Sequence, residues 1–164
     1  MGTVNTAKVA DFRTLKFANL DQMWAEVEAI AAADRAGTLR RIGNWTSGQT
    51  FGHLSTWIDF AYDGYPADMQ PPWIIKLILK FQKNKFMRGP MPRGVQIPGV
   101  AGGTKGTDLI SLEDGVTRLR RSVERLKTSP PTQRSPVFGP LTHEEAKDMN
   151  LRHAELHLGY LHPR

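Results

Sequence analysis

The chain has 164 residues, of which 40% are hydrophobic and 23% charged, which fits one soluble globular domain spanning residues 1–164. It contains no cysteine, which excludes disulfides, thiolate metal ligands and a cysteine nucleophile. The net charge is +6, but the basic residues are spread along the chain without a run of five. We therefore expect a charged surface and no nucleic-acid-binding face.

The sequence does not predict a segment that enters a membrane. The N-terminal residues contain no apolar run of the length that a signal peptide needs. The most apolar stretch, residues 71–79, is too short to span a bilayer and includes Lys76. We expect a cytoplasmic protein without membrane insertion.

Two helices are predicted in the first part of the chain. From Asn19, a suitable N-cap, apolar residues recur at helical spacing as far as Ala31. Thr46 and Gln49 form a capping-box pattern that opens a second helix, which extends to about Tyr62. The second helix is apolar on two sides, which indicates a central position in a bundle.

Three other stretches are less regular. Residues 1–18 read as a loosely packed lead-in. Residues 73–86, after Pro72, predict a short accessory helix. Residues 88–106 are rich in glycine and proline, which excludes regular structure, and we interpret them as an ordered crossover loop.

Two further helices complete the predicted fold. Ser111 begins one with a regular apolar seam and arginines outside it; the seam is Leu112, Val116, Leu119, Val123 and Leu126. Thr142 and Glu145 form another capping box, which begins a last helix that extends to Leu161. The prediction is an all-α fold: a four-helix bundle with a long crossover loop and a short accessory helix.

The last helix has two different faces. One carries Met149, His153, Leu156, His157 and Tyr160. The opposite stripe has the composition of a solvated face and consists of Asp148, Arg152, Glu155, Gly159 and His162.

Three histidines occupy faces that we expect to point inward. His153 and His157 lie four residues apart, a spacing that brings two imidazoles of a helix to one metal ion, and His53 lies on the predicted central helix. Buried imidazoles without a metal would each need a hydrogen-bond partner. The spacing therefore predicts a divalent metal site; imidazoles suit zinc, nickel, copper and iron, and we expect zinc or nickel. His143 and His162 are set aside by their positions.

A metalloprotease is not indicated. Metalloproteases with two helical histidines carry the catalytic glutamate directly after the first one, where this chain has Ala154. Glu155 falls on the opposite face of the helix.

The order of these motifs resembles the DinB-like (DinB/YfiT-like) superfamily of four-helix-bundle metalloenzymes, and within it a bacterial branch of unknown function. The similar segments are QTFGHLSTWID, PPWIIKLILK, MPRGVQIP and FGPLTHEE, within a resemblance from about Phe17 to Leu161. It implies that His53, His153 and His157 bind a divalent metal. The chain departs from that branch at three positions: Ser135, Ala146 and Leu156.

The superfamily includes thiol S-transferases and a thiol-dependent maleylpyruvate isomerase. The resemblance thus implies a metal-dependent enzyme with a small-molecule substrate, either a transferase that uses a low-molecular-weight thiol or a hydrolase. Trp57, Met91 and Tyr160 are our candidates for the pocket lining. No side chain stands out as a general base.

Two other interpretations stay open. The protein could be a non-catalytic helical module, with a structural metal or none, that binds an acidic partner through its basic surface. It could also be a metal-free bundle whose histidines are core residues. A homodimer is compatible with each interpretation.

Overall fold

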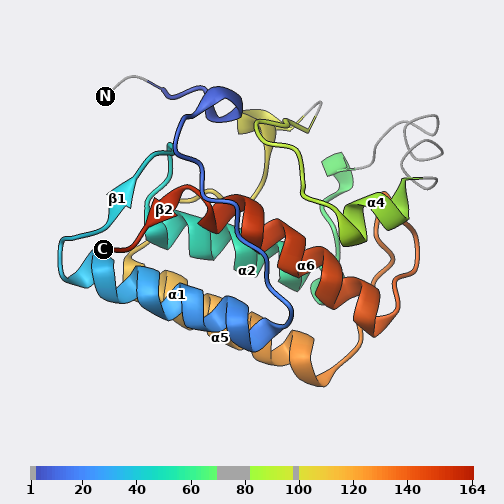
Figure 1. Ribbon diagram of the computed structural model, residues 1–164. Coiled ribbons are helices and arrows are strands. Elements are labelled where there is room, and N and C mark those ends of the chain that lie inside the picture. The colour runs from blue at the N-terminus through green and yellow to red at the C-terminus, as the bar shows by residue number, and fades with distance from the viewer. Residues whose placement is uncertain (1–2, 70–81, 98–99) are drawn as a thin grey trace.

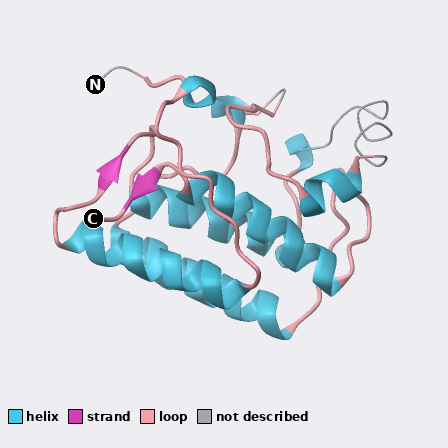
Figure 2. Cartoon of the chain, viewed as in Figure 1, coloured by secondary structure: helices cyan, strands magenta, loops and turns pink. Residues whose placement is uncertain are grey.

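The computed structural model describes residues 3–69, 82–97 and 100–164 of the chain. Four long helices dominate it and confirm the predicted all-α fold (Figures 1 and 2). They are α1 (Leu20–Arg35), α2 (Ser47–Asp63), α5 (Leu112–Thr128) and α6 (His143–Leu158). The smaller elements are helix α4 (Lys83–Arg88), the 3-10 turns η1 (Thr6–Lys8), η2 (Ala67–Met69) and η3 (Ala101–Gly103), and strands β1 (Arg40–Arg41) and β2 (Leu161–His162).

The predicted caps are confirmed at the start of all four long helices. The capping side chains accept a hydrogen bond from the backbone N–H three residues on; they are Asn19, Thr46, Ser111 and Thr142. Helix α6 ends earlier than predicted, at Leu158, because the chain leaves the helix at Gly159 and pairs Leu161 with Arg41 in a short antiparallel ribbon.

The helices form a bundle in which α1 lies beside α5 and α6 lies beside α2 (Figure 1). Helix α2 packs against α5, α6 and α1 and is buried on all sides from Thr50 to Ser55, which agrees with its predicted central position. The core is built from the apolar stripes of all four helices and includes Met23, Val27, Ile30, Phe51, Leu54, Ile58, Leu119, Leu126, Leu151 and Leu158.

Small residues allow α2 and α5 to approach each other closely. A Cβ atom on Gly115 would lie 2.8 Å from the carbonyl oxygen of Gly48, and one on Gly48 would lie 2.5 Å from the carbonyl oxygen of Ile110. Gly115, which is unfavourable for a helix by about 1 kcal/mol relative to alanine, is therefore explained by packing.

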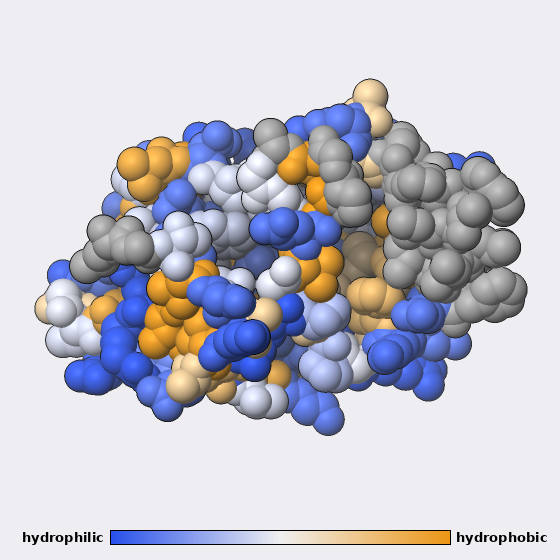
Figure 3. Space-filling view, turned by 90° about the horizontal axis from the view of Figure 1, so that it is seen from above, coloured by the Kyte–Doolittle hydropathy of each residue, from blue (hydrophilic) through white to orange (hydrophobic). Residues whose placement is uncertain are grey.

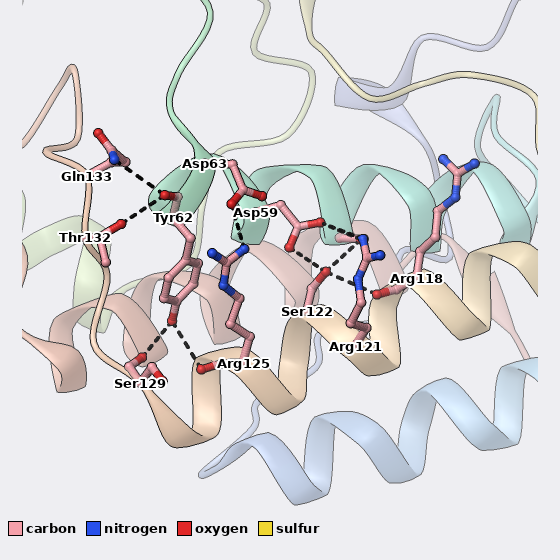
Figure 4. Close-up of polar contacts among 11 residues, drawn as sticks. Asp59, Tyr62, Asp63, Arg118, Arg121, Ser122, Arg125, Ser129, Thr132 and Gln133 are labelled. Carbon is pink, nitrogen blue, oxygen red and sulfur yellow. Dashed lines mark hydrogen bonds and ion pairs between the residues drawn. The ribbon is translucent and has the colours of Figure 1, made fainter.

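A buried network of polar side chains also joins these two helices. The hydroxyls of Ser55 and Ser122 lie 2.8 Å apart, and Ser122 donates to Asp59 over 2.8 Å (Figure 4 shows the Ser122–Asp59 part). We call Ser55, Asp59 and Ser122 the serine–aspartate network. Each member has a hydrogen-bond partner, so the network costs little to bury.

The outer face of α5 carries arginines that pair with neighbouring helices. Arg125 lies 2.8 Å from Asp63, and Arg121 lies 3.7 Å from Asp59 (Figure 4). Arg120 stacks over Trp24 of α1 at 4.5 Å. These contacts agree with the interpretation of this face as the exterior of a bundle helix.

One prediction about α6 is wrong, and the end of the N-terminal segment packs more closely than the rest of it. Arg152 and Glu155, predicted to be solvated, are each only 8% exposed and pair with each other at 2.9 Å. Arg152 donates to the carbonyl of Phe17 and Glu155 accepts from its N–H, each over 2.6 Å. The lead-in therefore packs on α6 up to the buried Phe17 (Figure 1). Helical periodicity could not show this, because the partners of both charges are backbone atoms from a distant segment.

The accessory helix and the crossover loop are described only in part. Helix α4 covers Lys83–Arg88 and packs on α6, whereas residues 73–81 of the predicted helix lie outside the described residues. The described parts of the crossover loop are irregular apart from η3, as expected. Gly106 has a φ of +74°, and a Cβ there would lie 2.7 Å from Thr56 of α2.

Seen from above, small hydrophobic patches alternate with hydrophilic residues on the described surface (Figure 3). None of the described helices combines the length and hydrophobicity needed to cross a bilayer.

Candidate metal centre

The structure brings the three predicted histidines together. His53 lies in the second turn of α2 and is 1% exposed, whereas His153 and His157 lie one turn apart on the adjacent α6 and are partly exposed. One ring nitrogen of each lies within 4.8 Å of the other two. The ring centroids are 4.4 to 5.0 Å apart.

Two of these nitrogens lie about as far apart as two nitrogens that bind the same metal ion. The Nε2 atoms of His53 and His153 are 3.1 Å apart. Two nitrogens bound to one tetrahedral zinc ion at about 2.0–2.1 Å lie about 3.3–3.4 Å from each other. A small adjustment of one side chain would therefore suffice for both to bind the same ion.

A backbone contact orients the ring of His53. Its Nδ1 lies 2.7 Å from the carbonyl oxygen of Lys105. A carbonyl only accepts, so Nδ1 carries the proton, and in the neutral ring Nε2 keeps a free electron pair on the side of His153. Metal-binding histidines are commonly oriented by such a bond. The carbonyl belongs to the crossover loop, which Lys105 also ties to Asp68 by an ion pair of 2.5 Å.

The environment keeps the imidazoles neutral. Burial lowers the pKa of His53 to about 4. Burial, and then the repulsion that protonated neighbouring imidazoles would exert, lowers the pKa values of His153 and His157 well below the usual range. Neutral imidazole is the form that binds metal, so the donor set fits a divalent cation near pH 7.

Two tryptophans surround the histidines. Trp57 was a predicted pocket residue, and its ring lies 6.0 Å from that of His53 and 5.5 Å from that of His153. Trp45 was not predicted: it stacks on His157 at 5.1 Å with an angle of 17° and lies 4.7 Å from His53. Because Trp45 belongs to the loop before α2, no periodic pattern could have indicated this contact.

The other pocket candidates lie in different surroundings. The hydroxyl of Tyr160 donates to the carbonyl of Thr6 over 3.0 Å, and its ring packs against Phe12. Met91 is partly buried in the crossover loop.

The two histidines that were set aside have structural partners. His143 Nε2 lies 2.6 Å from the carbonyl of Leu126 near the end of α5. His162 lies in β2, with Nδ1 3.2 Å from Arg40.

Comparison with known proteins places the chain in a family without assigning an activity. No curated protein and no solved structure matches the sequence. Residues 9–164 match the family described as "Protein of unknown function (DUF1569)". Since the match covers nearly the whole chain, the protein belongs to this family.

Proposed function

We propose that this protein is an enzyme that depends on a divalent metal held by His53, His153 and His157. The observation that carries the proposal is the convergence of three neutral imidazoles, with their ring nitrogens within 4.8 Å of one another. The contact of His53 with the carbonyl of Lys105 supports it further, because it directs Nε2 to the cluster. We expect zinc or nickel.

A divalent metal with three protein ligands keeps open positions and lowers the pKa of a water or thiol bound there. Among the described residues, no carboxylate joins the three histidines, and the chain has no cysteine. We infer that the nucleophile comes from solvent or from a small molecule. We infer a transferase that uses a low-molecular-weight thiol, since a thiol ionises more readily than water, with hydrolysis of a small molecule as the alternative.

The arrangement of the ligands supports a relation to the DinB-like superfamily. One histidine comes from the second long helix and two come from the last one, as the resemblance implies. The relation is part of the proposal and provides the reason for testing thiols first.

The alternative of a basic docking surface has less support. Arg121 and Arg125 are paired with carboxylates, and Arg120 stacks on Trp24. The positive charge of α5 is therefore partly neutralised within the bundle.

Elemental analysis of protein purified without an affinity tag or chelator tests the proposal. We expect about one equivalent of metal in the parent protein and its loss in His53→Ala and His153→Ala. His143→Ala is the matched control, because His143 lies on α6 but bonds to Leu126, and it should retain the metal.

Metal retained in His153→Ala, or no uptake by the parent on reconstitution, would remove the metalloenzyme proposal. With the metal identified, thiol transfer from small-molecule thiols is then assayed in the parent and in His143→Ala, which should be equally active.

A further inference from the structure

One buried polar atom beside the histidines has no partner. The described residues offer no hydrogen-bond partner to Nε1 of Trp57, to Nε of Arg152 or to Nε2 of His162. Arg152 and His162 each have another nitrogen in a polar contact. Trp57 has no other polar atom, so its side chain is left with an unmet donor, which is unfavourable in a buried position.

The position of Trp57 links this donor to the histidine cluster. Trp57 follows His53 by one turn of α2, and its ring lies 5.5 Å from that of His153. His153 and Trp57 are both partly exposed, whereas Nε1 of Trp57 is itself buried. An indole N–H can only donate, and its missing partner must therefore be an acceptor.

The charge of the site indicates what kind of acceptor this is. Imidazoles bind a metal in their uncharged form, and no carboxylate of the described residues joins the three histidines. A divalent cation held there would keep its full positive charge, which attracts an anion. A carboxylate has two acceptor oxygens, one for the cation and one for a neighbouring donor.

Aromatic side chains continue from Trp57 away from the histidines. Phe60 lies 6.1 Å from Trp57, and Tyr65 lies 5.8 Å from Phe60. All three are partly exposed, and burial raises the pKa of Tyr65 to about 12, so that its hydroxyl stays uncharged. This aromatic row favours a flat apolar group over a charged one.

We propose that the site binds an aromatic carboxylate, that Trp57 Nε1 donates a hydrogen bond to the carboxylate, and that the ring of the ligand lies along the aromatic row. The inference rests on the proposed metal site. Trp57 is thus a residue that positions the ligand and selects for its charge.

Calorimetric titration of zinc-loaded protein with benzoate tests the inference. Trp57→Phe keeps an aromatic ring and removes the N–H. We expect it to bind benzoate about tenfold more weakly, the size of effect expected for a lost hydrogen bond to a charged group. The matched control is Trp24→Phe, since Trp24 Nε1 donates to Glu28 on α1, and it should bind as the parent does. Acetate and the uncharged benzyl alcohol should bind the parent more weakly than benzoate.

A second measurement does not depend on how well a variant folds. Addition of benzoate to the zinc-loaded parent should shift one of the four indole N–H resonances, the one that Trp57→Phe lacks. Zinc content is measured on every sample. Two results would overturn this inference and leave the metal site standing, provided that the histidines bind zinc. One is equal benzoate affinity in Trp57→Phe and the parent, and the other is no benzoate binding by the parent. Failure of the parent to bind either zinc or nickel would overturn both, and acetate binding as tight as benzoate would remove the aromatic row from the proposal.

Discussion

Helix α2 carries two buried polar clusters, one toward α5 and one toward α6. Toward α5 lies the serine–aspartate network, in which every side chain has a partner within the network. Toward α6 lie His53, His153 and His157, and the described residues provide a hydrogen bond outside the cluster only for His53. Each cluster has three side chains, and neighbouring turns of α2 contribute His53 to one and Ser55 and Asp59 to the other.

The difference shows that buried polarity alone does not identify a functional site. The serine–aspartate network is complete, so it can hold two helices together without any ligand. In the histidine cluster the Nε2 atoms of His53 and His153 face each other over 3.1 Å, so that one proton or one cation must lie between them. Such an arrangement is favourable only when a cation or a proton occupies it. We therefore expect the serine–aspartate network to serve stability and the histidine cluster to serve binding.

The largest effect is expected where α2 and α5 touch. Gly115→Ala places a Cβ 2.8 Å from the carbonyl oxygen of Gly48, an atom of the backbone that cannot move easily. We expect the free energy of unfolding to fall by about 3 kcal/mol, because overpacking outweighs the better helix propensity of alanine. Urea denaturation measures it, with Thr117→Ala on the exposed face of α5 as the control.

Metal content per folded molecule should be unchanged in Gly115→Ala. If the variant instead kept its stability, the close approach of the two helices would not be a constraint on the sequence.

Metal binding to the histidine cluster should stabilise the protein by an amount comparable to the loss in Gly115→Ala. At a free metal concentration of about 100 times Kd, binding to the folded state adds about 2.7 kcal/mol. Denaturation with metal and with chelator measures the gain, which should vanish in His157→Gln and persist in Ser122→Ala. A gain that survived in His157→Gln would place the stabilising metal elsewhere.

The helices and their beginnings were predictable because local patterns determine them. Capping residues and apolar spacing act over three to four residues, and the structure confirms all four capped starts. The i, i+4 pair His153 and His157 was visible for the same reason. His53 was included in the predicted site because α2 was predicted to be central, which its burial supports.

The features that escaped prediction depend on contacts between distant segments. Trp45 reaches His157 from a loop, and the backbone of Phe17 pairs with Arg152 and Glu155. The carbonyl of Lys105 orients His53 from the crossover loop. No periodic pattern encodes which loop or backbone atom approaches a helix, so these partners appear only in the structure.

A smaller loss of stability is expected when the serine–aspartate network is opened. Ser122→Ala removes the donor to Asp59 and the partner of Ser55 in a fully buried position. We expect a loss of about 2 kcal/mol, because buried polar groups are left unpaired. Chemical denaturation of Ser122→Ala, Ser55→Ala and the double variant measures the coupling. Strictly additive losses would contradict a cooperative network.

The smallest expected effect is a loss of stability at low pH in the absence of metal, which should depend on the histidine cluster and not on the serine–aspartate network. The pKa of His53 is about 4 in the folded protein, below the ordinary histidine value of 6.5 that we take for the unfolded chain. Between these values the unfolded chain binds a proton that the folded protein does not, so stability falls as the pH drops from 6.5 toward 4 and is unaffected by this group above 6.5. At pH 5.5 the loss from His53 is about 1 kcal/mol. The free energy of unfolding is therefore measured in chelator at pH 7.5 and 5.5, and it should fall less in His53→Gln than in the parent. Ser122→Ala should lose as much stability as the parent, because the serine–aspartate network contains no histidine. Equal drops in the parent and His53→Gln would mean that the imidazole is protonated in the folded state, and the cluster would then lack the free electron pair on which metal binding depends.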